Sequence, residues 1–147
     1  GKGEMKDWRN EMQVLPIGKG KKLRDGDDIA VLSIGPIGNE VIKAIEMVKE
    51  AGVSIAHYDM IYLKPLDEEL LHEIGQKYNR IITVENGVIK GGFGSAVLEF
   101  MADNGYTPHV KRIGVPDAFI EHGSIPELYQ LCGMDAESIA KQLKKEN

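Results

Sequence analysis

The stretch "IAVLSIGPIGNEVIKAIEMVKEAG", residues 29–52, contains the pattern that decides the fold. It opens with a continuous apolar run, residues 29–35, which is typical of a strand covered on both faces, so we expect this strand at the centre of a sheet. Pro36 suits the first turn of a helix, and Gly52 suits its stop. Between them, apolar residues and the aliphatic part of one lysine side chain recur at helical spacing: Val41, Ile42, Ile45, Val48 and Lys49. The stretch therefore predicts one strand-helix unit.

The same alternation continues on both sides of this unit. Strands are predicted over residues 53–60, 80–85 and 109–115, and helices over 67–78 and from about 94 to 103. Upstream, "VLPIGKGKKLRDGDD" predicts a short strand, a glycine turn and a second short strand. Downstream, the capping box Ser124–Glu127 predicts a helix that Gly133 ends, and Asp135 can cap a last helix. Because parallel neighbours need crossover connections, this order predicts a mostly parallel sheet with helices on both faces.

Composition limits the class of protein. The 147 residues are 42% hydrophobic, enough for one globular domain with a real core. A net charge of −5 argues against nucleic-acid binding, which depends on clustered Lys and Arg. Cys132 is the only cysteine, which suits the cytosol, and no apolar run approaches the roughly 20 residues that a bilayer requires. The chain starts without Met, which suggests a piece of a longer protein.

Four glycines lie between the strand at 80–85 and the helix that follows, where free N–H groups of a helix start often bind anions. The known phosphate codes do not fit: bulky Val97 replaces the third small residue of a dinucleotide loop, and Phe93 replaces the lysine of a phosphate loop. We favour a packing role. In it Gly91, Gly92 and Gly94 allow positive φ or close backbone approach, so that Phe93 packs into another surface. A ligand loop remains the alternative.

The titratable residues assemble no active site in the sequence. His57, His72 and His109 show no metal-ligand spacing, and we interpret them as structural. His122 follows a strand end, so it could transfer protons, although a hydrogen-bonded structural role is favoured. Glu85 could act as a general acid or base, but we favour its carboxylate as a cap for the N–H groups of the glycine loop.

Four segments carry a resemblance to a known family. "IAVLSIGP", "YLKPLDEELL", "TVENGVIKGGFGSAVLEF" and "VPDAFIEHGS", in this order, resemble the C-terminal domain of 1-deoxy-D-xylulose-5-phosphate synthase, a transketolase-like enzyme. The resemblance runs from about Leu15 to Leu143. Its KPLD and GGFG elements are shared with transketolases and with β subunits of 2-oxo acid dehydrogenases, whereas FIEHG and GMDAESIA narrow it to the synthase. Asn86 is a mild departure, since an acidic residue is more usual there.

This resemblance implies a three-layer α/β/α domain with a mixed, mostly parallel sheet whose first strand is antiparallel to the others. Residues 1–14 would be a linker from an upstream domain, and residues 15–147 the transketolase C-terminal-like domain. The parent enzyme joins pyruvate to glyceraldehyde 3-phosphate with release of CO2, using thiamine diphosphate and Mg²⁺, and serves isoprenoid and thiamine biosynthesis. Because upstream domains hold both cofactors, no catalytic, cofactor-binding or metal residue is expected in this chain.

The expected role of the chain is therefore structural, within a cytoplasmic homodimer. Its predicted contacts with upstream domains or with a second subunit are Gly91, Gly92, Phe93, Gly94, Phe119 and His122. Two alternatives remain open: the matching domain of a transketolase or 2-oxo acid dehydrogenase β subunit, and a free-standing anion-binding α/β module.

Overall fold

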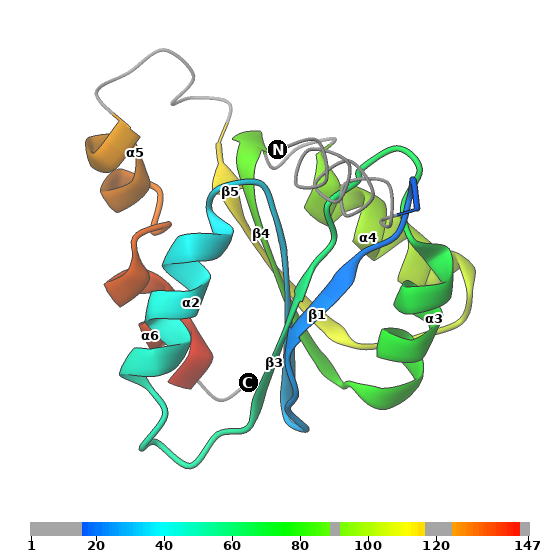
Figure 1. Ribbon diagram of the computed structural model, residues 1–147, viewed down its shortest axis with the longest axis horizontal. Helices are drawn as coiled ribbons and strands as arrows, with labels where there is room; N and C mark the ends of the chain where they lie inside the picture. Colours follow the sequence, from blue (N-terminus) through cyan, green and yellow to red (C-terminus); the bar gives the residue numbers. More distant parts are fainter. Residues whose placement is uncertain (1–15, 89–91, 117–124, 145–147) are drawn as a thin grey trace, which may run out of the picture.

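A five-stranded sheet forms the middle of the molecule (Figure 1). The computed structural model describes residues 16–88, 92–116 and 125–144. The strand order is β1-β3-β2-β4-β5, with β2 to β5 parallel and β1 antiparallel to β3. The strands are β1 (Lys21–Arg24), β2 (Ile29–Ile34), β3 (Ile55–Asp59), β4 (Arg80–Val88) and β5 (His109–Val115). This confirms the predicted mixed sheet with an antiparallel first strand.

Helices cover both faces of this sheet (Figure 1). One face carries α2 (Gly38–Met47), α5 (Ile125–Leu131) and α6 (Ala136–Lys144), and the other carries α3 (Glu68–Lys77) and α4 (Phe93–Asp103). Each face has its own hydrophobic core. The three-layer α/β/α prediction is confirmed. Within the described residues, no helix is long and apolar enough to cross a bilayer.

The central strand β2 contributes side chains to both hydrophobic cores, as its apolar run predicts. Ile29 and Val31 pack toward α2 and α6, whereas Ala30 and Leu32 pack toward α3 and α4. All four residues are 0% exposed. Successive side chains of a strand point to opposite faces, so a strand covered on both sides needs apolar residues at every position.

The prediction for α2 is wrong in two respects. Ile42 is 52% exposed, and Ala44 lies in the core instead, because the buried stripe runs through Val41, Ala44 and Ile45. The helix ends at Met47 rather than at Gly52, whose φ of +80° serves the turn beyond. In the sequence, Ile42 also follows the helical spacing of the apolar residues, so it was predicted on the buried side. Only one face of the helix can lie on the sheet, however, and Ile42 lies outside that face.

The predicted ends of the other strands and helices agree with the structure to different degrees. Ile17 lies in a turn, so the expected first short strand does not include it, and residues 14–15 lie outside the described residues. β4 continues to Val88, three residues past the predicted end. Ser124 of the capping box lies outside the described residues. The last helix starts as predicted, with Asp135 Oδ2 accepting a hydrogen bond from Ser138 N at 3.4 Å.

Candidate functional site

Glu85 and Asn86 are consecutive residues near the carboxyl end of β4, the edge where open α/β sheets usually place function. Their side chains point to opposite faces of the sheet. Each one holds the N-terminal region of a helix on its own face, Glu85 at α4 and Asn86 at α2. This pair of side chains is the polar centre of the candidate site.

Glu85 fills the N-terminus of α4. Its Oε1 accepts a hydrogen bond from Phe93 N at 2.9 Å, and its Oε2 accepts one from Gly94 N at 2.7 Å. The residue is 3% exposed, and burial raises the pKa of its carboxyl, although both N–H groups and Arg112 oppose that rise. The predicted capping role is confirmed. Since a carboxylate already occupies these N–H groups, a phosphate would meet both a filled donor set and a like charge.

Gly94 lets α4 approach the sheet. A Cβ on Gly94 would lie 2.6 Å from Thr83 Oγ1 and 3.0 Å from Arg112 Cγ, too close for any larger residue. Gly92 has a φ of −91° and Gly94 has no positive φ, so close approach rather than positive φ explains the glycine at position 94. At Gly94, the structure therefore supports the second of the two predicted reasons, close backbone approach.

Phe93 differs from its predicted position. Its ring is 1% exposed and packs in the α3/α4 core with residues such as Leu32 and Met60. The prediction placed Phe93 at a contact with another domain or subunit, but the ring is already covered by its own domain. The surface into which Phe93 packs is the sheet beneath α4, because the short approach at Gly94 brings the helix start down onto β4.

Asn86 links two helices on the opposite face. Its Oδ1 accepts a hydrogen bond from Ile37 N at 2.9 Å, next to the start of α2, and its Nδ2 donates to the hydroxyl of Tyr129 on α5. A carboxylate here could accept from Ile37 but could not donate to Tyr129 as the amide does. Asn86 therefore suits this double role.

Two of the histidines make structural hydrogen bonds. His57 Nε2 lies 2.7 Å from Ser33 Oγ across β2 and β3, and burial lowers the pKa of His57 to about 4. His72 Nδ1 lies 2.8 Å from the hydroxyl of Tyr106. These contacts confirm the structural interpretation of both residues. The Ser33–His57 pair gave no local signal, because its members lie 24 residues apart and meet only through strand pairing.

Gly91, Phe119 and His122 lie outside the described residues, as does the linker 1–14. Their predicted contact roles, and the possible proton transfer by His122, stay predictions. Within the described ranges, no group of three or more His, Cys, Asp or Glu side chains is arranged to hold a metal ion.

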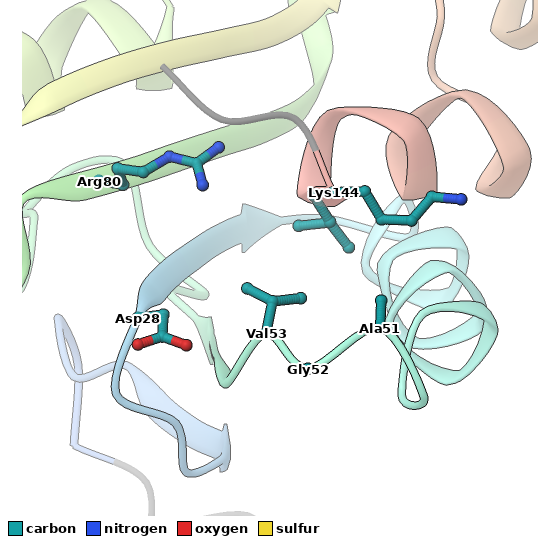
Figure 2. Close-up of a pocket in the computed structure, with 7 residues that line it drawn as sticks. Asp28, Ala51, Gly52, Val53, Arg80 and Lys144 are labelled. Atoms are coloured by element: carbon teal, nitrogen blue, oxygen red, sulfur yellow. The ribbon is translucent and has the colours of Figure 1, made fainter.

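A hollow of about 490 Å³ lies at the opposite edge of the sheet (Figure 2). Its charged residues are Asp28, just before β2, Arg80, at the start of β4, and Lys144, at the end of α6. Figure 2 shows the Lys144 ammonium directed away from Asp28 and Arg80, so the three charges do not converge on one point. Asp28 Oδ2 also accepts a hydrogen bond from Ser54 N at 2.8 Å. This hollow does not form a recognisable ligand site.

Comparison with known proteins places the chain in a family. The model of the transketolase C-terminal domain matches residues 18–139. The chain is 99% identical over all 147 residues to 1-deoxy-D-xylulose-5-phosphate synthase of Parabacteroides distasonis, and 58% identical over 146 residues to the enzyme of that name from Bacteroides fragilis. It spans 23% and 22% of these relatives, so it is less than a quarter of their length.

A solved structure agrees with this assignment. The chain is similar to a split-gene transketolase described as an inactive β4 tetramer, with a TM-score of 0.79 and 30% identity. The match covers 88% of this chain and 42% of the other. The family match, the high identity and the shared fold agree, and the chain belongs to the transketolase C-terminal domain family.

Proposed function

We propose that this chain is the C-terminal domain of a 1-deoxy-D-xylulose-5-phosphate synthase. The full-length protein would join pyruvate to glyceraldehyde 3-phosphate, with release of CO2, as a cytoplasmic homodimer that uses thiamine diphosphate and Mg²⁺. The observation that carries the proposal is 99% identity over the whole chain to a protein of that name. At this identity a different substrate class would be unexpected.

The N-terminus of α4 does not fit the diphosphate of the cofactor. A diphosphate needs free backbone N–H groups or cationic side chains, and the N-terminus of α4, where the glycines suggested such a site, is filled by Glu85. This geometry supports a domain that contributes assembly contacts while other parts of the protein bind thiamine diphosphate. It also argues against the alternative of a free-standing module that holds an anion at the glycine loop.

The contact surface in this proposal is the carboxyl edge of the sheet. Gly91, Gly92, Phe119 and His122 would contact upstream domains or the second subunit. Gly94 and Phe93 would act indirectly, by fixing the start of α4. Asn86 would fix α5 beside it through Tyr129.

Two measurements test this proposal. The full-length protein should form 1-deoxy-D-xylulose 5-phosphate from pyruvate and glyceraldehyde 3-phosphate, and a form that lacks residues 16–147 should lose this activity together with its dimeric mass. Transketolase activity on sugar phosphates, or acetyl transfer from pyruvate to a lipoyl carrier, would instead favour the related families.

The second measurement is a calorimetric titration of thiamine diphosphate with Mg²⁺ into the 147-residue chain. We expect no binding heat, with the full-length protein as the positive control. Micromolar binding by the chain alone would show that the domain holds the cofactor and would contradict its assignment as a contact domain.

A further inference from the structure

A second hollow lies between β1 and α2, away from the carboxyl edge. It has a volume of about 350 Å³, within the range of small-molecule pockets. We call it the β1–α2 hollow; it is lined by Leu23, Arg24, Ile42, Ile45, Glu46 and His57. The helix residues among these are spaced at i, i+3 and i+4, so they share one side of α2.

The floor of the hollow contains a ring nitrogen without a partner. His57 is 1% exposed, and its Nε2 lies 2.7 Å from Ser33 Oγ. Among the described residues nothing hydrogen-bonds to its Nδ1. Because burial keeps the pKa of His57 far below neutrality, the ring is neutral. If the Ser33 hydroxyl donates to Nε2, Nδ1 carries the proton and can donate it to a ligand in the hollow.

A cation stands beside this nitrogen. Arg24 is the register partner of His57 across β1 and β3, so both side chains lie on the same face of the sheet. The structure gives Arg24 no ion pair anywhere in residues 16–88, 92–116 or 125–144. The carboxylate of Glu46, which also lines the hollow, is bound by Lys49 at 2.5 Å, and Lys49 together with the weaker attraction of Arg24 lowers the pKa of Glu46. With the tautomer in which Nδ1 carries the proton, Arg24 and His57 are two donors that line the same hollow and can bind one anionic head group.

The wall of the hollow is apolar and partly open to solvent. Ile42 is 52% exposed and Leu23 is 44% exposed, although both are large hydrophobic residues. These two side chains and the guanidinium of Arg24 make a surface with an apolar part and a cationic end.

We propose that the β1–α2 hollow binds a small amphipathic carboxylate or phosphate ester. Its apolar body lies against Leu23 and Ile42, and one head-group oxygen accepts hydrogen bonds from Arg24 and His57. The inference goes beyond the proposed function and does not depend on it, because binding here is measured without assaying any reaction.

The test uses octanoate as the probe and the full-length protein that contains this chain. Calorimetry should show saturable binding, with octan-1-ol, which has the same number of carbons but no charge, at least tenfold weaker. A diazirine analogue of octanoate, activated by light, should label the peptides that contain Leu23 and Ile42, and excess octanoate should suppress that labelling.

Variants separate this site from nonspecific apolar binding. Arg24→Ala and Ile42→Glu should each weaken octanoate binding at least tenfold, and both positions are exposed enough to tolerate the change. Leu98→Glu is the matched control, since Leu98 is 40% exposed on α4, across the sheet, and it should leave binding unchanged. The proposal is overturned by no binding at millimolar octanoate, by labelling elsewhere, or by equal losses in the control. If another domain of the full-length protein covers the hollow, the diazirine analogue cannot label the peptides that contain Leu23 and Ile42. That result would overturn the proposal as well.

Discussion

On the face of the sheet covered by α3 and α4, Glu85 lies buried against two backbone N–H groups, Phe93 fills the core and Gly94 brings helix and strand into contact. On the face covered by α2, α5 and α6, Asn86 holds its helix from an exposed position, and a hollow reaches the buried His57. The N-terminus of α4 is thus closed to an anion by Glu85, whereas the hollow on the other face is open to solvent. Glycines between a strand and a helix therefore do not by themselves indicate a ligand site, because the neighbouring side chains decide whether the N–H groups are free.

Glu85→Ala should have the largest effect of the changes considered. It leaves the N–H groups of Phe93 and Gly94 buried without an acceptor, which costs about 4 kcal/mol of unfolding free energy. Urea unfolding followed by circular dichroism measures this loss. Glu99→Ala, on the exposed side of α4, is the control and should stay within about 0.5 kcal/mol. Equal effects of both changes would show that the Glu85 contacts contribute little.

Protonation of His57 should destabilise the other face. Its folded-state pKa of about 4 is below the ordinary 6.5, so the unfolded chain binds the proton more tightly. Its contribution to stability is complete above pH 6.5 and is lost as the pH falls toward 4, a total of about 3 kcal/mol. Urea unfolding of wild type and His57→Gln at pH 7 and pH 5 isolates this contribution. An identical fall in both proteins would assign the pH dependence to other groups.

Gly94→Ala should destabilise the closed face by about 2 kcal/mol, because the added methyl group overlaps Thr83 Oγ1 and Arg112. The same unfolding measurement applies. Gly87→Ala is the matched control, since its added Cβ would meet only Glu85 Oε1 at 3.8 Å, an ordinary contact. If both variants are equally stable, α4 can shift outward and the close approach is not required.

Asn86→Ala should have the smallest effect, about 1 kcal/mol, because Asn86 is exposed and water can take the place of its side-chain oxygen beside the Ile37 N–H. Asn86→Asp sharpens the comparison: it keeps the acceptor for Ile37, and Tyr129 can donate its hydroxyl to the carboxylate instead of accepting, so its stability should lie closer to wild type than that of Asn86→Ala. A loss from Asn86→Ala as large as that from Glu85→Ala would remove the contrast between the two faces.

Much of the candidate site could be predicted from the chain alone. Glu85 ends an apolar strand and is followed by glycines, so a cap for the next helix was a natural interpretation. The failure of the phosphate codes at Phe93 and Val97 likewise favoured packing over ligand binding. By contrast, the burial of Phe93 in its own domain, rather than at a neighbour, depends on how deeply Gly94 lets α4 descend, which no local pattern measures.

The sequence by itself determined the alternation of strands and helices, the central place of residues 29–35 and the three layers, because periodicity and continuous apolar runs arise from residues close together in the chain. Only the tertiary structure decided that Ile42 is exposed, that Ser33 meets His57 and that Arg24 stands beside it. These outcomes depend on strand order and register, which bring together residues far apart in the sequence. Side chains that face each other across a sheet have no fixed spacing along the chain, so their pairing cannot be read from any local pattern.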